Sequence, residues 1–88
     1  MKRYILCRNN FSDEFVKQIE AATPPDWHIV MSRKGVAASA ISPNYLFIVS
    51  GSRTQQKEQT LKIRFGGGAA ARTFNLPLGN FAEFLGRF

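Results

Sequence analysis

The chain is poor in the side chains that most catalytic and metal sites use. It has one cysteine, Cys7, and one histidine, His28, among 88 residues. A single cysteine excludes a disulfide within the chain and is typical of a reducing compartment. One thiol and one imidazole are also too few for a zinc site, which takes three or four such ligands. We therefore expect no metal and no cofactor.

Long apolar runs are missing as well. The run that follows Lys2 and Arg3 stops at Arg8, and it is shorter than the roughly 7 to 15 residues of a secretory signal core. No stretch approaches the roughly 20 apolar residues that cross a bilayer. These absences predict a cytoplasmic protein without membrane contact.

Catalytic and nucleotide-binding motifs are also missing. Cys7 and His28 are embedded in apolar runs, where cysteine is usually a small hydrophobic residue and not a nucleophile. Asp13 and Glu14 are adjacent at the start of a predicted helix, where carboxylates favour the helix dipole. The glycine and alanine run at 66–71 lacks the Gly-Lys-Ser/Thr ending of a P-loop. We expect a non-enzymatic protein, in which this run is either a flexible connection or a backbone cradle for phosphate.

Negative charge is scarce beyond residue 26. Residues 27–88 hold eight bases and two acids, which accounts for the whole net charge of +6. A concentrated positive field attracts nucleic acid and other polyanions. The predicted nucleic-acid-binding residues are the five bases between 53 and 72, namely Arg53, Lys57, Lys62, Arg64 and Arg72.

The residues that are present indicate one small α+β domain over residues 1–88. The expected order is β-α-β-(β)-β-β-β-α, with a mostly antiparallel sheet of about four to six strands and two helices at about 12–22 and 79–88. Apolar runs place strands at 2–8, 27–31, 45–49, 61–65 and 72–76. The small residues at 36–41 leave a further edge strand open.

Local signals support the two helices. Ser12 is a favourable N-cap, and Phe11 and Val16 have the spacing of a hydrophobic staple. A proline at 24 ends this helix near Ala22. At the other end of the chain, an apolar helix face follows from four residues at i, i+3, i+4 and i+7: Phe81, Phe84, Leu85 and Phe88.

The most informative strand is 61–65, because its apolar residues alternate with Lys62 and Arg64. Strict alternation predicts one buried face and one basic, solvent-facing side. The segment 50–60 has no apolar residue. It is either a long mobile hairpin loop or a loop with one exposed helical turn beginning at Ser52.

Two functions are consistent with these patterns. The first is contact with nucleic acid or another polyanion through the basic strand and loops of residues 53–72. The second is a protein-binding inhibitor or adaptor of the phage or mobile-element type, which acts on a host protein complex. Three strands look apolar on both sides, whereas two short helices cover about one face of a sheet. The uncovered face predicts a homodimer contact or a partner.

Overall fold

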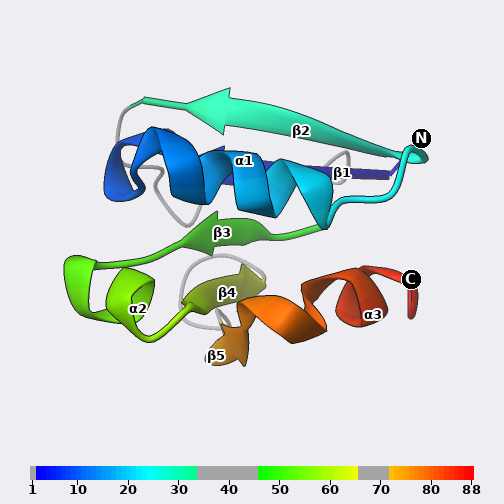
Figure 1. Cartoon of the computed structure of the whole chain (residues 1–88). Coiled ribbons are helices and arrows are strands. Elements are labelled where there is room, and N and C mark those ends of the chain that lie inside the picture. The colour runs from blue at the N-terminus through cyan, green and yellow to red at the C-terminus, as the bar shows by residue number, and fades with distance from the viewer. Residues whose placement is uncertain (1, 34–45, 66–71) are drawn as a thin grey trace.

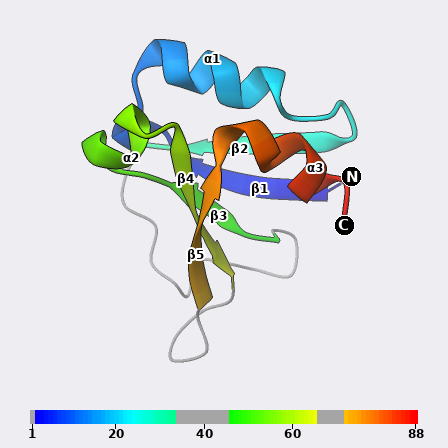
Figure 2. The same cartoon turned by 60° about the horizontal axis from the view of Figure 1, so that its bottom comes forward.

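The computed structural model describes residues 2–33, 46–65 and 72–88. Five strands form one sheet in the order β2-β1-β3-β4-β5, and α1 and α3 lie on the same side of it (Figures 1 and 2). The elements are β1 (Lys2–Cys7), α1 (Asp13–Ala21), β2 (Trp27–Ser32), β3 (Ile48–Ser50), α2 (Arg53–Lys57), β4 (Thr60–Phe65), β5 (Arg72–Pro77) and α3 (Phe81–Leu85). Short 3-10 turns at Arg8–Asn10 and Leu78–Asn80 follow β1 and precede α3.

The predicted α+β domain is confirmed, and its sheet is mixed. β1 pairs in parallel with β2 and β3, whereas β4 pairs antiparallel with β3 and β5. A parallel pair needs a crossover, and α1 supplies it between β1 and β2. The open strand at 36–41 and the glycine run at 66–71 lie outside the described residues. Within the described residues, no helix is long and apolar enough to cross a bilayer.

Both predicted helices form, and the first matches closely. The Ser12 side chain accepts a hydrogen bond from the Phe15 backbone N–H at 3.2 Å, and Ala22 is the C-cap. Phe11 and Val16 are both buried, as the staple requires. The second helix is shorter than 79–88, because Leu78–Asn80 forms a 3-10 turn before α3 begins at Phe81.

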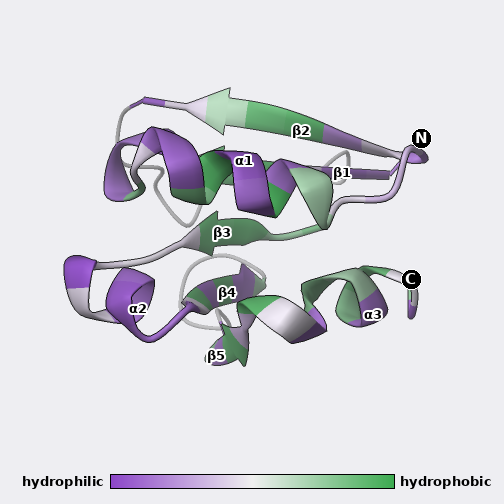
Figure 3. Cartoon of the chain, in the orientation of Figure 1, coloured by the Kyte–Doolittle hydropathy of each residue, from purple (hydrophilic) through white to green (hydrophobic). Residues whose placement is uncertain are grey.

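The polar segment 50–60 contains the single helical turn that was one of its two predicted forms. α2 begins after Ser52, whose hydroxyl accepts from the Gln55 backbone N–H at 3.2 Å. The helix is hydrophilic throughout (Figure 3). It is attached to α1 by a hydrogen bond of 3.0 Å from the Ser12 backbone N–H to Gln56 Oε1. A polar contact therefore takes the place of the missing apolar stripe.

The core lies between the sheet and α1 and α3, and aromatic rings dominate it. Tyr4 stacks on Phe47 with ring centroids 5.3 Å apart, and Phe81 of α3 meets Tyr4 edge-on at 5.6 Å. Phe81 and Leu85 are fully buried, so the docking of α3 closes the core. Such offset and edge-on ring pairs add to the stabilisation that burial provides.

One strand is less covered than its sequence predicts. The run at 27–31 reads as apolar on both sides, but β2 lies at the edge of the sheet that the described strands form, and His28 and Met31 are exposed. Trp27 is the buried residue of this strand, and its ring packs against Tyr4 and Phe47. The run at 45–49 does provide the central strand, because β3 lies third of five.

The two ends of the described chain meet. Lys2 on β1 donates from Nζ to the main-chain oxygen of Phe88, and it lies 3.9 Å from the Asp26 carboxylate. The same ammonium lies 5.9 Å from the centre of the Trp27 ring. The lysine therefore links the first strand, the turn before β2 and the segment that follows α3.

Candidate functional site

The strands direct two different sets of side chains to the two sides of the sheet. Successive side chains alternate along a strand, so the side opposite α1 and α3 has a composition of its own. We call this side the second face. Its central cross-strand row is Val30, Ile5, Ile48, Arg64 and Thr73, and on either side of that row lie Lys62 opposite Asn75 and Arg3 opposite His28.

Every charge on the sheet is positive. The five strands contain Lys2, Arg3, Lys62, Arg64 and Arg72 and no acid. The six acids all lie elsewhere: Asp13, Glu14 and Glu20 on α1, Asp26 before β2, Glu58 at the end of α2 and Glu83 on α3. No strand residue therefore neutralises the positive charge of the second face.

Three bases belong to the second face. Lys62 and Arg64 share it on β4, as the alternation predicts, and Arg3 joins them from β1. Arg3 and Lys62 are exposed, and within the described ranges neither makes a side-chain hydrogen bond or an ion pair. With strands about 4.8 Å apart and about 3.3 Å per residue, the three positions extend over roughly 16 Å.

Arg64 is the most unusual of the three. It lies opposite Ile48 in the central row, and Ile5 lies on the far side of Ile48; both isoleucines are buried. Its Nε is buried and has no hydrogen-bond partner in the described structure. An unsatisfied buried donor costs roughly 1 to 3 kcal/mol, and more when it is charged. The burial of this one N–H is therefore not compensated by any hydrogen bond within the described residues.

The other predicted bases do not converge on this face. Lys57 on α2 lines a hollow of about 190 Å³ against α1, together with Glu14. Arg53 precedes it by one helical turn. Arg72 pairs in register with Phe65, so it has the parity of the helix-covered face. Of the five predicted residues, only Lys62 and Arg64 thus lie side by side.

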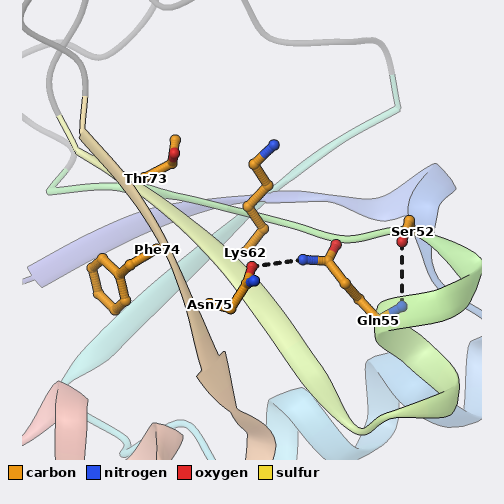
Figure 4. Close-up of a pocket in the computed structure, with 6 residues that line it drawn as sticks. All are labelled: Ser52, Gln55, Lys62, Thr73, Phe74 and Asn75. Carbon is orange, nitrogen blue, oxygen red and sulfur yellow. Dashed lines mark hydrogen bonds between the residues drawn. The ribbon is translucent and has the colours of Figure 1, made fainter.

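A polar hollow of about 430 Å³ borders the second face where α2, β4 and β5 meet (Figure 4). It is lined by Ser52, Gln55, Lys62, Thr73, Phe74 and Asn75. Gln55 Nε2 donates to Asn75 Oδ1 at 2.8 Å, which ties α2 to β5 across the floor of the hollow. No carboxylate is among its lining residues.

The thiol and the imidazole are not brought together. Cys7 pairs with Ser32 and His28 with Arg3, so the two lie four register positions apart, or roughly 13 Å along the strands. Among the described residues, no group of three or more His, Cys, Asp or Glu side chains is close enough to hold a metal ion. The register of β1 and β2 therefore does not place Cys7 and His28 side by side as a thiol–imidazole pair.

The side chain of Tyr4, which has a shifted pKa, lies in the core and away from the second face. Burial raises the pKa of Tyr4 to about 12. Its hydroxyl lies 2.7 Å from Thr23 Oγ1, which donates in turn to the Ile19 carbonyl at 2.8 Å. Tyr4 therefore donates to Thr23 and serves packing.

Comparisons of the chain with protein-family models, with curated proteins and with solved structures find no match. The geometry and charge of the second face are therefore the features of this chain that bear on its function.

Sequence patterns missed Arg3 and His28 as members of this face. The run around Tyr4 is apolar on both sides, so it gives no alternation from which the direction of Arg3 follows. One signal was available in the sequence: the predicted strands contain several bases, Arg3 among them, and no acid. This signal needs no knowledge of the register between strands.

Proposed function

We propose that this chain is a non-enzymatic protein that binds nucleic acid or another polyanion through the second face of its sheet. The observation that supports this function is the separation of charge, with every acid on helices, caps or turns and three bases, Arg3, Lys62 and Arg64, on one side of the strands, where the described residues offer them no carboxylate. A cytoplasmic location remains a prediction.

Salt dependence gives the first test. Each phosphate that a base neutralises contributes about −0.7 for single strands and −0.9 for duplex to the slope of log affinity against log salt. Three bases therefore predict a slope of about −2 to −3, or a roughly 20- to 40-fold loss of affinity from about 50 to about 200 mM salt. Fluorescence anisotropy with labelled single-stranded DNA, duplex DNA and RNA measures this slope. No binding to any of the three at about 50 mM salt would refute the proposal.

A matched pair of triple variants tests the location. Changing Arg3, Lys62 and Arg64 to Gln removes the bases of the second face, and changing Lys17, Arg33 and Arg87 to Gln removes three bases outside it. Both variants lower the net charge from +6 by the same amount. We expect the first variant to lose binding at about 50 mM salt and the second to keep at least half of the wild-type affinity. Equal losses would mean that net charge alone is responsible.

The edge strand β5 favours a second candidate function, the protein-binding inhibitor or adaptor. β5 pairs only with β4 among the described strands, and Phe74 at its centre is 39% exposed. An edge strand with an exposed aromatic residue suits a protein partner that adds a strand to the sheet. The homodimer also remains a prediction, although the apolar centre of the second face, Ile5 and Ile48, is already buried within one chain.

Two variants separate the candidates. Phe74→Glu alters the edge strand, whereas Lys62→Gln alters the second face. A stoichiometric protein captured from a nuclease-treated lysate by wild type and Lys62→Gln, but not by Phe74→Glu, would support the inhibitor or adaptor. Loss of every partner on nuclease treatment would support nucleic-acid binding. Light scattering on the purified chain reports the homodimer directly.

A further inference from the structure

The hollow between α2, β4 and β5 contains a set of hydrogen-bond donors that no described residue satisfies. Lys62 and Thr73 project to the same side of the β4–β5 pair, and the Phe74 ring points to the other side (Figure 4). Lys62 pairs in register with Asn75, so their side chains are neighbours on adjacent strands. One ammonium, one hydroxyl and one amide thus line the same wall.

Two internal hydrogen bonds fix which groups remain available. Asn75 Oδ1 accepts from Gln55, so the Asn75 amide N–H groups are the ones left for a ligand. Ser52 Oγ accepts from the Gln55 backbone N–H, so its O–H remains to donate. With Thr73 and Lys62, the hollow therefore offers four donor side chains: two hydroxyls, one amide and one ammonium.

This donor set selects the class of ligand. A metal ion is excluded by the Lys62 ammonium and by the lack of a carboxylate among the lining residues. A phosphate group presents acceptor oxygens in several directions, and hydrogen bonds to an ionised acceptor are about twice as strong as neutral ones. The hollow therefore matches a phosphate better than it matches a neutral ligand.

We infer that this hollow seats one phosphate of a nucleic-acid backbone, held by Lys62, Thr73, Asn75 and Ser52. The inference rests on the proposed function and adds a fixed contact point to it. Arg64 lies two residues along β4 on the same face, roughly 7 Å away, so it is placed for a neighbouring phosphate. Phosphate contacts of this kind set the orientation of a strand without reading its bases.

An uncharged substitution distinguishes a seat from general attraction. Thr73→Val removes one donor and leaves the net charge unchanged, and Thr54→Val is its control, because Thr54 is an exposed threonine of α2 outside the hollow. We expect Thr73→Val to weaken binding of a labelled single-stranded oligonucleotide about 3- to 10-fold with the same salt slope. We expect Thr54→Val to change the affinity less than 2-fold.

Inorganic phosphate gives a readout that does not need nucleic acid. In ¹H–¹⁵N spectra at constant ionic strength, phosphate should shift the side-chain amide signals of Asn75 and Gln55. The same titration of Lys62→Gln should give less than a quarter of that shift, and Lys17→Gln, which lies on α1 outside both the hollow and the second face, should respond as wild type does.

The outcomes separate the two proposals. If oligonucleotides bind with the predicted salt slope but Thr73→Val equals Thr54→Val, the seat is wrong and the proposed function stands. If phosphate shifts the Asn75 and Gln55 amides but no oligonucleotide binds, the seat is supported as an anion site and its assignment to nucleic acid is overturned. If neither ligand has an effect, both proposals fail. Thermal melts of each variant check that the fold is retained, and every substituted side chain in the hollow is exposed.

Discussion

The two faces of the sheet come from the same five strands but perform different tasks. The helix-covered face is made of rings and aliphatic side chains, and its members Tyr4, Phe47 and Ile63 are fully buried. The second face carries Arg3, Lys62 and Arg64 around a buried pair of isoleucines. Because neighbouring residues of one strand serve opposite faces, substitutions one position apart should affect different properties. Stability should depend on the first face and anion binding on the second.

The strongest way to break the helix-covered face is to remove α3. Phe81→Ala should cost about 3 to 5 kcal/mol, because it empties a fully buried site against Tyr4. A chain of this length has only about 4 to 13 kcal/mol of stability, so deletion of residues 81–88 should abolish cooperative unfolding. Urea denaturation followed by circular dichroism measures both. Phe88→Ala, at a side chain that is 41% exposed, is the milder control. A cooperative melt of the truncated chain near that of the full chain would contradict the assigned role of α3.

Alkaline pH tests the same face through Tyr4. Its pKa is higher in the folded chain, about 12, than the ordinary value of 10.0, so the folded state holds the proton more tightly. The resulting stability is present below pH 10 and is lost as the pH rises through 12, by about 2 to 3 kcal/mol in all. Unfolding curves of wild type and Tyr4→Phe over this range isolate the effect, because only wild type has this phenol. Parallel pH dependence of the two proteins would show that Tyr4 is not the group responsible.

A smaller effect is expected where α2 meets the core. A Cβ on Gly51 would lie 2.8 Å from Phe11 Cε1, and Phe11 is itself stacked on Phe15. Gly51→Ala should therefore cost about 1 to 3 kcal/mol through overpacking. Gly79→Ala is the matched control, since nothing lies within 4 Å of its Cβ, and we expect no loss there. Chemical denaturation of both variants measures the two changes in the free energy of unfolding. An unchanged Gly51→Ala would mean that Phe11 moves aside freely.

The smallest change in stability, with the opposite sign, is expected on the second face. Arg64→Met keeps an unbranched stem opposite Ile48 and removes the buried, unpaired Nε. We expect stability to rise by up to about 1 kcal/mol while the salt slope of nucleic-acid binding falls by about 0.7 to 0.9. Lys62→Met, at an exposed position, should lower the slope equally and leave stability within about 0.5 kcal/mol. A destabilised Arg64→Met would show that the guanidinium supports the fold.

The sequence predicts those features of the two sheet faces that depend on the local pattern of residues. Alternation places Lys62 and Arg64 on one side of β4, and the cap at Ser12 and the apolar spacing around Phe81 locate the two main helices. The sequence did not show to which side of the sheet Arg72 points, because that depends on which residue of β5 pairs with Phe65 of β4. Alternation fixes the sides within one strand, and only the pairing register relates them to the sides of the next strand.

The site itself depends on contacts between distant segments, which is why sequence reasoning found only part of it. Arg3 reaches the face through the pairing of β1 with β3, and the two segments are more than forty residues apart. The floor of the hollow needs the bond between Gln55 and Asn75, which joins two elements that look unrelated in sequence. Composition showed that the positive charge lies in the second part of the chain, but it did not show which side of the sheet would carry it.

The contact between Phe81 of α3 and Tyr4 of β1 has a consequence for how the protein is made. β1 is hydrogen-bonded on both sides, to β2 and to β3, and it emerges from the ribosome before the other strands described. Phe81 and Leu85, which complete its aromatic surroundings, emerge among the last residues of the chain described. At roughly 5 to 20 residues per second, the apolar side of the nascent sheet stays open for several seconds before α3 can close it. During translation, this surface is therefore the one that a chaperone would meet.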